Sequence, residues 1–330
     1  MAALRTLYHT EVCFTMGRMS DFHFPSANGV NEIHCRLWTP DGGVRGVVQM
    51  VHGVAEHIGR YNDFAEFLTS HGFAAVGDDH LGHGLSVRDD SELGWFAEND
   101  GWDLLIKDEK TLRDRMQESY PGTPLVLLGH SMGSFIARTY IGEHPDDFTA
   151  CILSGTGHTS AVVCSAGLAM ARSEVRRRGS KYRSAALQKM AFGSYLKGIQ
   201  DPIGSHDWIC RDPEVIRAYT DDPLCGWTAT AGLMRDMMTG LSLIRRGSHM
   251  RKMNRDMPVL FISGTADPVG SWGKGVPTVA NRFLSVGMRD ITLKMYPEAR
   301  HEVLNELNRQ EVWMDVLTWL EKKAWCPDET

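Results

Sequence analysis

The 330-residue sequence has no long hydrophobic run and no excess of positive charge. No stretch approaches the roughly 20 consecutive apolar residues that a transmembrane helix needs, so we expect no membrane span. The net charge of −6 gives no basic surface of the kind that binds nucleic acid, so we expect no nucleic-acid partner. The N-terminal residues also lack the apolar core of a secretory signal peptide, which favours a cytoplasmic location.

Metal-binding and cofactor-binding patterns are also missing. The seven cysteines are odd in number and never spaced as C-x-x-C, which argues against a disulfide framework and a zinc knuckle. "HEVLN" at His301 begins like the zincin motif H-E-x-x-H but ends in Asn305. His80 and His83 in "DDHLGHG" fit local hydrogen bonds better than metal ligation. Neither a Walker loop nor a dinucleotide-binding glycine motif is present, so we expect no metal and no cofactor.

What the sequence does contain is an alternation of buried strands and helices. A nearly continuous apolar run such as 47–51 predicts a strand covered on both faces. We predict strands at 47–51, 73–80, 124–130, 148–155, 257–264 and 291–297. Helical patterns lie between or after them, at 61–72, 102–120, 134–144, 277–287 and 304–324. This alternation predicts an α/β fold, with a mostly parallel central sheet and helices on both faces.

Two segments depart from the alternation. Residues 21–38 alternate around Asn28-Gly29, a favoured tight turn, and predict an antiparallel hairpin. Residues 157–247 show helical patterns and no strand, which predicts a helical cap inserted into a core of residues 19–156 and 248–330. Residues 1–18 lack periodicity, and we interpret them as a disordered or poorly fixed leader.

The stretch "LLGHSMGSF" places Ser131 between Gly129 and Gly133, after an apolar run and before a helical one. This is G-x-S-x-G in the strand-turn-helix setting that exposes a serine hydroxyl at the edge of a sheet. Side chains at the two glycine positions would collide with neighbouring backbone in so sharp a turn. We therefore predict that Ser131 is a nucleophile, with an ordinary glycine-rich turn as the alternative.

A serine nucleophile needs a base, and the base needs an acid that orients it. In this type of fold the acid and then the histidine follow the serine along the chain. Asp267 follows the strand at 257–264, and His301 follows the last strand. A turn-forming aspartate before Pro268 and a loop histidine are the alternatives for each residue taken alone. Their joint appearance in this order predicts a catalytic triad.

Backbone N–H groups are predicted to stabilise the oxyanion. One donor is the N–H of Met132, the residue after the nucleophile. The other is the N–H of Val54, in the loop "VHGVAEH" after the first parallel strand. Loss of one such donor costs about 3–4 kcal/mol of barrier.

Five segments resemble the α/β-hydrolases of the monoacylglycerol lipase and lysophospholipase group, also called serine aminopeptidase S33-like hydrolases. They are "HGVAEHIGRY", "DDHLGHGLS", "GHSMG", "SGTADPVG" and "RHEVLNE". The resemblance implies the α/β-hydrolase fold with a cap, and the same triad and oxyanion donors. It also implies that Glu56 and Arg60 line the polar end of the pocket. In mammalian monoacylglycerol lipase a second histidine follows the catalytic one by three positions, and Leu304 stands there, which puts glycerol recognition in doubt.

Two features of the predicted cap concern the substrate. Met234 and Met238 belong to an apolar stripe between Leu233 and Ile244, and methionine adapts to acyl chains of varied shape. The stripe could equally pack the cap onto the core. Basic side chains concentrate in the segment 172–183 and could touch an anionic membrane surface transiently, although a solvated surface is the simpler interpretation.

These features predict a serine hydrolase that cleaves carboxylic esters of medium or long acyl chains through an acyl-enzyme. The expected partner is a small-molecule acyl ester such as a monoacylglycerol or a lysophospholipid. The alternatives are other acyl chemistry on the same residues, as in a peptidase, thioesterase or acyltransferase, and a non-catalytic interaction protein that kept the fold.

Overall fold

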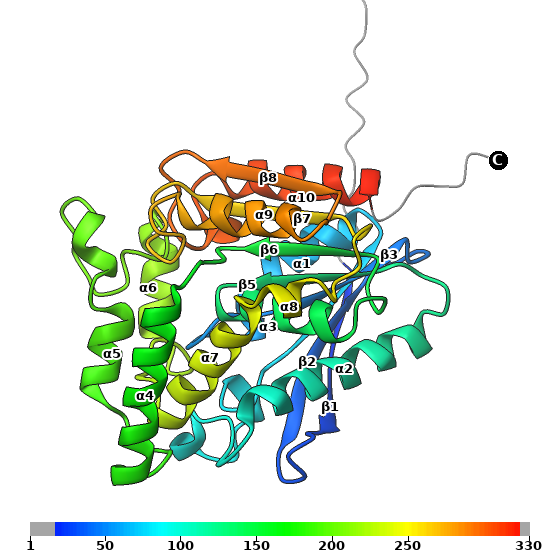
Figure 1. Cartoon of the computed structure of the whole chain (residues 1–330). Coiled ribbons are helices and arrows are strands. Elements are labelled where there is room, and N and C mark those ends of the chain that lie inside the picture. The colour runs from blue at the N-terminus through cyan, green and yellow to red at the C-terminus, as the bar shows by residue number, and fades with distance from the viewer. Residues whose placement is uncertain (1–16, 324–330) are drawn as a thin grey trace, which may run out of the picture.

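A computed structural model describes residues 17–323 of the chain and places an eight-stranded sheet at the centre (Figure 1). The strands are β1 (Arg18–Pro25), β2 (Glu32–Thr39), β3 (Gly46–Val51), β4 (Phe73–Asp78), β5 (Leu125–His130), β6 (Ala150–Ser154), β7 (Val259–Gly264) and β8 (Ile291–Tyr296). Their order across the sheet is β1-β2-β4-β3-β5-β6-β7-β8. Neighbours from β4 to β8 pair in parallel, whereas β2 is antiparallel to both β1 and β4. The predicted mostly parallel sheet is confirmed.

The N-terminal hairpin is confirmed as well. β1 and β2 pair from Arg18 opposite Thr39 to Pro25 opposite Glu32. Gly29 adopts a φ of +71° in the loop between them, a conformation that glycine adopts without steric cost. β1 begins at Arg18, so the last residue of the predicted leader, residues 1–18, already belongs to the sheet. Residues 1–16 lie outside the described residues.

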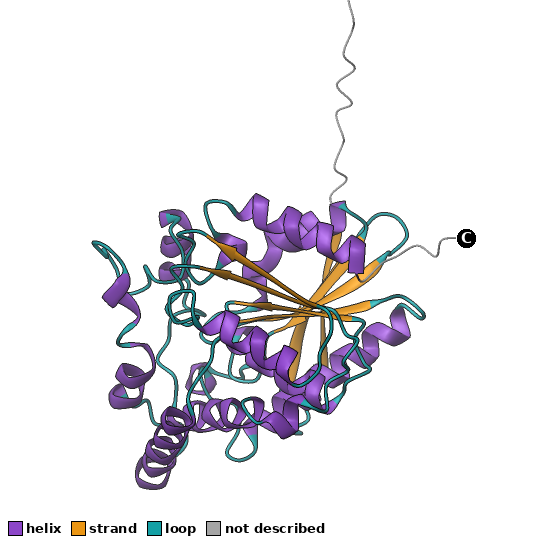
Figure 2. Cartoon of the chain, turned by 45° about the horizontal axis from the view of Figure 1, so that its top comes forward, coloured by secondary structure: helices purple, strands orange, loops and turns teal. Residues whose placement is uncertain are grey.

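Helices cover both faces of the sheet (Figure 2). α1 (Asn62–Ser70) and α10 (Arg309–Lys323) pack on one face. α2 (Gly101–Ser119), α3 (Met132–Glu143) and α9 (Gly275–Ser285) pack on the other. Every residue of β3, β4, β5, β6 and β7 is buried, because helices shield these strands from both sides. This burial on both faces explains why the strands appear in the sequence as continuous apolar runs.

The last helix begins later than predicted. A short 3-10 turn, η5 (Val303–Asn305), precedes it, and Glu306 then adopts an extended conformation. The fully buried Glu306 carboxylate accepts the backbone N–H of Arg300 at 2.8 Å and of Leu307 at 3.0 Å, and pairs with Arg211 at 2.9 Å. These bonds hold the chain in a bend, so the regular helix starts only at Arg309 and the predicted start at residue 304 is wrong.

Five α-helices lie between β6 and β7, and four of them fall within residues 157–247, the segment predicted to be an insertion. They are α4 (Ala161–Arg178), α5 (Ala185–Phe192), α6 (Pro213–Asp221), α7 (Ala231–Ile244) and the short α8 (Gly247–Met250). Figure 1 shows α4, α5 and α6 together beyond one end of the sheet, while α7 returns toward α3. The described part of this segment contains no strand, only an isolated bridge between Arg183 and Thr230.

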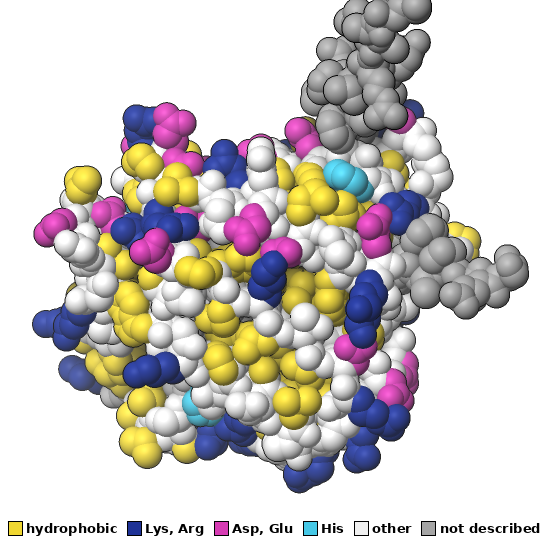
Figure 3. Space-filling view, turned by 90° about the horizontal axis from the view of Figure 1, so that it is seen from above, with side chains coloured by type: hydrophobic (Ala, Val, Ile, Leu, Met, Phe, Trp, Pro, Cys, Tyr) yellow, Lys and Arg dark blue, Asp and Glu magenta, His cyan; other side chains and the backbone are white. Residues whose placement is uncertain are grey.

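The surface carries charges of both signs. On the face shown in Figure 3, acidic and basic side chains are scattered among apolar and polar ones. None of the helices within residues 17–323 combines the length and apolar character needed to cross a membrane.

Candidate active site

Ser131 occupies a strained turn between β5 and α3. Its φ is +53° and its ψ is −119°, a conformation that side-chain-bearing residues rarely adopt. A Cβ atom added to Gly133 would lie 1.9 Å from the carbonyl oxygen of Val51. One added to Gly129 would lie 2.4 Å from the carbonyl oxygen of Gly133. The turn is therefore the sharp elbow expected from the sequence, and only glycine fits on either side of the serine.

Asp267 and His301 are brought together from the ends of β7 and β8. The imidazole Nδ1–H of His301 donates to Asp267 Oδ1 at 3.0 Å, which assigns this tautomer. The carboxylate also accepts the N–H of Val269 at 2.8 Å and the hydroxyl of Ser263 at 3.3 Å. Burial alone would lower the pKa of His301, but the charge and hydrogen bond of Asp267 more than offset it and raise that pKa above 6.5.

A single cavity of about 170 Å³ is lined by both Ser131 and His301. Among the described residues, the buried Nε2 atom of His301 has no hydrogen-bond partner. Since Nδ1 is bound to Asp267, Nε2 is the ring nitrogen left to face a group in the cavity. The structure thus gathers Ser131, Asp267 and His301 from three distant parts of the chain at the carboxyl edge of the sheet.

Val54 and Met132 line the same cavity. Met132 is the first residue of α3, where the N–H has no partner inside the helix. The loop of Val54 lies against Ser131, since a Cβ added to Gly53 would be 3.0 Å from Ser131 Cβ. Within the part of the chain that the structure describes, neither N–H donates a hydrogen bond to another protein group.

Glu56 and Arg60 have different surroundings. Glu56 lines the cavity and accepts the N–H of Gly53 at 2.5 Å. Arg60 does not line it; its guanidinium lies behind, bound to Glu56 at 2.7 Å and to both oxygens of Glu302 at 2.6 Å. Burial alone would raise the pKa of Glu302, but Arg60 lowers it to about 2. The resemblance implies that Arg60 lines the pocket. In the structure, two carboxylates instead hold its guanidinium away from the cavity.

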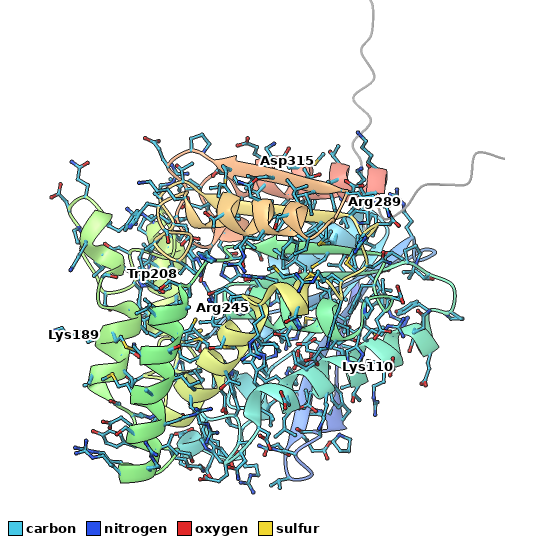
Figure 4. The ribbon with its side chains drawn as sticks, in the orientation of Figure 1. Lys110, Lys189, Trp208, Arg245, Arg289 and Asp315 are labelled. Carbon is cyan, nitrogen blue, oxygen red and sulfur yellow. The ribbon has the colours of Figure 1, made fainter. Side chains whose placement is uncertain are left out.

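Apolar side chains of α7 form one wall. Met237, Met238 and Leu241 line the cavity, whereas Met234 does not. Met234 is 1% exposed and packs in the core, so only part of the predicted stripe faces the site. Residues that sequence reasoning missed form much of the remaining lining: Phe135, Phe192, Tyr195, Trp208, Tyr219 and Glu302. Figure 4 shows Trp208 where the inserted helices meet the core, while Lys189 points outward from α5.

Histidines near β4 make local contacts. His80 Nδ1 lies 3.1 Å from Asp78 Oδ2, and its Nε2 lies 3.2 Å from the carbonyl oxygen of His52. Burial lowers the pKa of His83 to about 3, so its ring is neutral. Among the described residues, two groups have donor atoms close enough to hold a metal ion: Asp78, His80 and Glu109, and His57, Asp222 and Cys225.

The family described as serine aminopeptidase, S33 (Hydrolase_4) matches residues 42–308. The chain belongs to this family. This S33-family member is 31% identical to the monoacylglycerol lipase of Mycolicibacterium smegmatis over 305 residues, which cover 91% of this chain and 96% of that relative. It is 28% identical to the monoglyceride lipase of Homo sapiens over 310 residues, 92% of this chain and 90% of the human protein.

A solved structure has the same architecture. The carboxyl esterase from Bacillus coagulans, in complex with glycerol, superposes on this S33-family chain with a TM-score of 0.87 and 30% identity. The superposition covers 94% of this chain and 100% of the esterase. The chain therefore has the α/β-hydrolase fold and is an ester hydrolase of the esterase and lipase type.

Proposed function

We propose that this hydrolase cleaves monoacylglycerols and related single-chain esters through an acyl-enzyme on Ser131. The observation that carries the proposal is the cavity shared by Ser131 and His301, with Asp267 bound to the far side of the imidazole. The names of the relatives add the substrate class, since two of them are monoacylglycerol lipases. Ser131, Asp267 and His301 act as nucleophile, base and orienting acid in this proposal.

The proposed reaction has two steps. The Ser131 hydroxyl gives its proton to His301 Nε2 and attacks the ester carbonyl, and the imidazolium then protonates the departing alcohol. A water molecule, activated by the same imidazole, hydrolyses the acyl-enzyme and releases the fatty acid. Asp267 stabilises the imidazolium and holds its ring in place. The N–H groups of Val54 and Met132 bind the oxyanion in both steps.

The cavity lining supports an acyl chain as the occupant. Met237, Met238 and Leu241 offer an apolar wall, and methionine side chains adjust to chains of different length. Glu56 and Glu302 are the carboxylates on the lining and supply acceptors for the hydroxyl groups of an alcohol. In this proposal Arg60 is a positioning residue for the two carboxylates, and Met234 supports α7 from the core side.

Contact with a lipid surface follows from the position of exposed apolar side chains. Val162, Val163 and Met190 are exposed on α4 and α5, and two of them, Val163 and Met190, also line the cavity. Arg176, Arg177 and Arg178 end α4. We infer that the mouth of the cavity rests transiently on lipid, with these cations near anionic headgroups.

A reducing compartment suits the cysteines. Cys35, Cys151, Cys164, Cys210 and Cys225 are free and buried. Free thiols are typical of cytosolic proteins, so we propose a cytoplasmic location.

Two experiments test the proposed function. A fluorophosphonate probe should label the native protein on Ser131 and leave the Ser131→Ala variant unlabelled. A panel of acyl esters, aminoacyl amides and acyl thioesters, matched in chain length where possible, should then show fastest turnover for the esters. Absence of labelling in folded native protein contradicts the triad, and faster amide or thioester cleavage contradicts the substrate class.

A further inference from the structure

His57, Asp222 and Cys225 bring three different metal-binding groups together beside the active-site loop. One imidazole nitrogen, one carboxylate oxygen and the thiol sulfur all lie within 4.8 Å of one another. His57 follows Val54 and Glu56 in the loop after β3, whereas Asp222 and Cys225 follow α6 in the inserted segment. We propose that these three side chains bind a zinc ion, which joins the active-site loop to the inserted helices.

The ligand set suits zinc. Zinc accepts imidazole, carboxylate and thiolate ligands in tetrahedral geometry, and sites with three protein ligands keep a water molecule in the fourth position. Its bonds are about 2.0 Å to nitrogen and oxygen and about 2.3 Å to sulfur, so the donor atoms need to move by only about 1 Å. Hard cations such as Mg²⁺ prefer oxygen ligands and do not match an imidazole and a thiolate.

The site is open enough for an ion to reach it. The side chains of His57 and Asp222 are 17% and 30% exposed, and Cys225 is 8% exposed. The second group of possible ligands, Asp78, His80 and Glu109, differs in this respect, since each of its residues is only 1% exposed. That second group is therefore more enclosed than the first.

The two segments are already docked where the ion would join them. The N–H of Gly226 and the hydroxyl of Tyr219 both donate to the carbonyl oxygen of Ala55, each at 2.9 Å. His57 Nε2–H donates to Asp222 Oδ2 at 2.9 Å. Binding therefore needs no new approach of the segments, and the ordering cost of bringing the ligands together is small.

Protons and charges balance when zinc binds. The proton on His57 Nε2 moves to Nδ1, at the cost of the 3.2 Å hydrogen bond that Nδ1 accepts from Gly59. The Cys225 thiol releases its proton to solvent, because the thiolate is the ligand. The dication with one carboxylate and one thiolate is then neutral overall. The positive charge of the nearby Arg60 therefore opposes binding little.

Binding would fix the backbone beside the cavity. Val54, whose N–H we propose as an oxyanion donor, is three residues before His57 and next to Ala55. A bond from His57 to zinc ties this loop to the segment after α6 more firmly than the present hydrogen bonds do. The site lies outside the triad, so zinc binding does not depend on the proposed reaction.

The test uses the full chain after removal of metal with a chelator. Equilibrium dialysis against zinc should load about one ion per chain and raise the melting temperature, since a ligand that binds only the folded state stabilises it. Cobalt(II) should bind in its place and show the near-ultraviolet charge-transfer absorption of a thiolate ligand. Cys225→Ser and Asp222→Asn should each bind zinc more than about tenfold more weakly and lose the thermal shift, the serine variant also losing the absorption.

Cys210→Ser is the matched control, because Cys210 is a second buried cysteine of the inserted segment outside this group. It should retain the stoichiometry, the thermal shift and the absorption. The melting temperature without metal shows whether each variant is folded. If Cys225→Ser does not fold, Asp222→Asn provides the test. Native-like zinc affinity in folded Cys225→Ser or Asp222→Asn, or cobalt binding without thiolate absorption, overturns the proposal.

Discussion

Arg60 holds Glu302, the residue next to His301, through two N–O contacts of 2.6 Å. The same guanidinium binds Glu56 at 2.7 Å, and Glu56 accepts the N–H of Gly53 beside Val54. One cation, its side chain 11% exposed, therefore connects the loop that carries the proposed base with the loop that carries a proposed oxyanion donor.

Replacement of Arg60 by methionine should destabilise the protein by about 3–5 kcal/mol, because it leaves two buried carboxylates unpaired. Urea unfolding measures this loss. Arg217→Met is the control, since Arg217 pairs with Glu214 at the surface, with side chains 67% and 82% exposed, and should cost less than about 1 kcal/mol. Equal losses in the two variants contradict the role given to Arg60.

The ion pair of Arg60 and Glu302 should contribute to the unfolding free energy only over a defined pH range. The pKa of Glu302 is lowered from 4.5 to about 2 in the folded protein. A carboxyl group with a lowered pKa stabilises the fold above its unfolded pKa, and the contribution is lost as the pH falls through the folded value. We therefore expect the native protein and Arg60→Met to approach each other in unfolding free energy as the pH falls from 4.5 toward 2. A constant difference across that range contradicts this account.

Activity should fall in acid with a midpoint above pH 6.5. In the proposed mechanism His301 must be neutral to accept the Ser131 proton, and Asp267 raises its pKa from 6.5, so the charged, inactive form persists to higher pH. Asp267→Asn removes the charge that raises this pKa. That variant should lose about 10³–10⁴-fold in kcat and shift its remaining acid limb to lower pH. The pH dependence of kcat/KM checks both statements, and an acid limb unmoved by Asp267→Asn contradicts them.

The strained turn at Ser131 gives a prediction that separates stability from activity. Ser131→Gly should raise the unfolding free energy by about 1–3 kcal/mol, because glycine adopts a φ of +53° without the side-chain penalty. Ser131→Ala keeps the Cβ atom and should leave stability nearly unchanged. Both variants should lose ester hydrolysis. If the glycine variant is no more stable than the alanine variant, the turn does not store the strain described here.

Gly133→Ala should prevent stable folding, since the new Cβ would lie 1.9 Å from the Val51 carbonyl oxygen. The backbone on both sides is fixed by the sheet and by α3, so the clash cannot relax easily. Gly42→Ala is the control, because its Cβ would meet nothing within 4 Å. Soluble expression and circular dichroism compare the two, and a native-like Gly133→Ala protein contradicts the packing of the elbow.

Met238→Ala and Met234→Ala form a matched pair on α7. Both remove a buried methionine and should cost about 2–5 kcal/mol. Only Met238 lines the cavity, so only Met238→Ala should shift the preferred ester toward longer acyl chains. A chain-length series of p-nitrophenyl esters checks this difference. A similar shift in both variants would mean that Met234 also reaches the substrate.

Much of the fold could be predicted because burial leaves a simple pattern. The strands from β3 to β7 are covered on both faces, so each reads as a continuous apolar run. Ser131 could be located because its glycines satisfy a steric demand that shows in the sequence itself. The start of α10 could not be predicted, because the buried side chain of Glu306 bends the chain through contacts with residues distant in sequence, such as Arg211.

The lining of the cavity beside Ser131 was harder to predict for a similar reason. α7 is buried on almost every side, so its apolar spacing does not tell which methionine faces the cavity and which faces the core. Phe192, Tyr195, Trp208 and Tyr219 come from separate parts of the inserted segment and share no periodic pattern. The resemblance places Arg60 on the lining, and its two carboxylate partners explain why it lies behind the lining.

The pairing of β6 with β7 has a consequence for biosynthesis. The turn that carries Ser131, the proposed nucleophile, lies within about the first 145 residues, whereas the proposed acid and base follow the last two strands. In the proposed mechanism, a chain made only as far as α8 has Ser131 without its acid and base and should not hydrolyse esters. The proposed mechanism therefore expects ester hydrolysis only once β7 and β8 have joined the sheet.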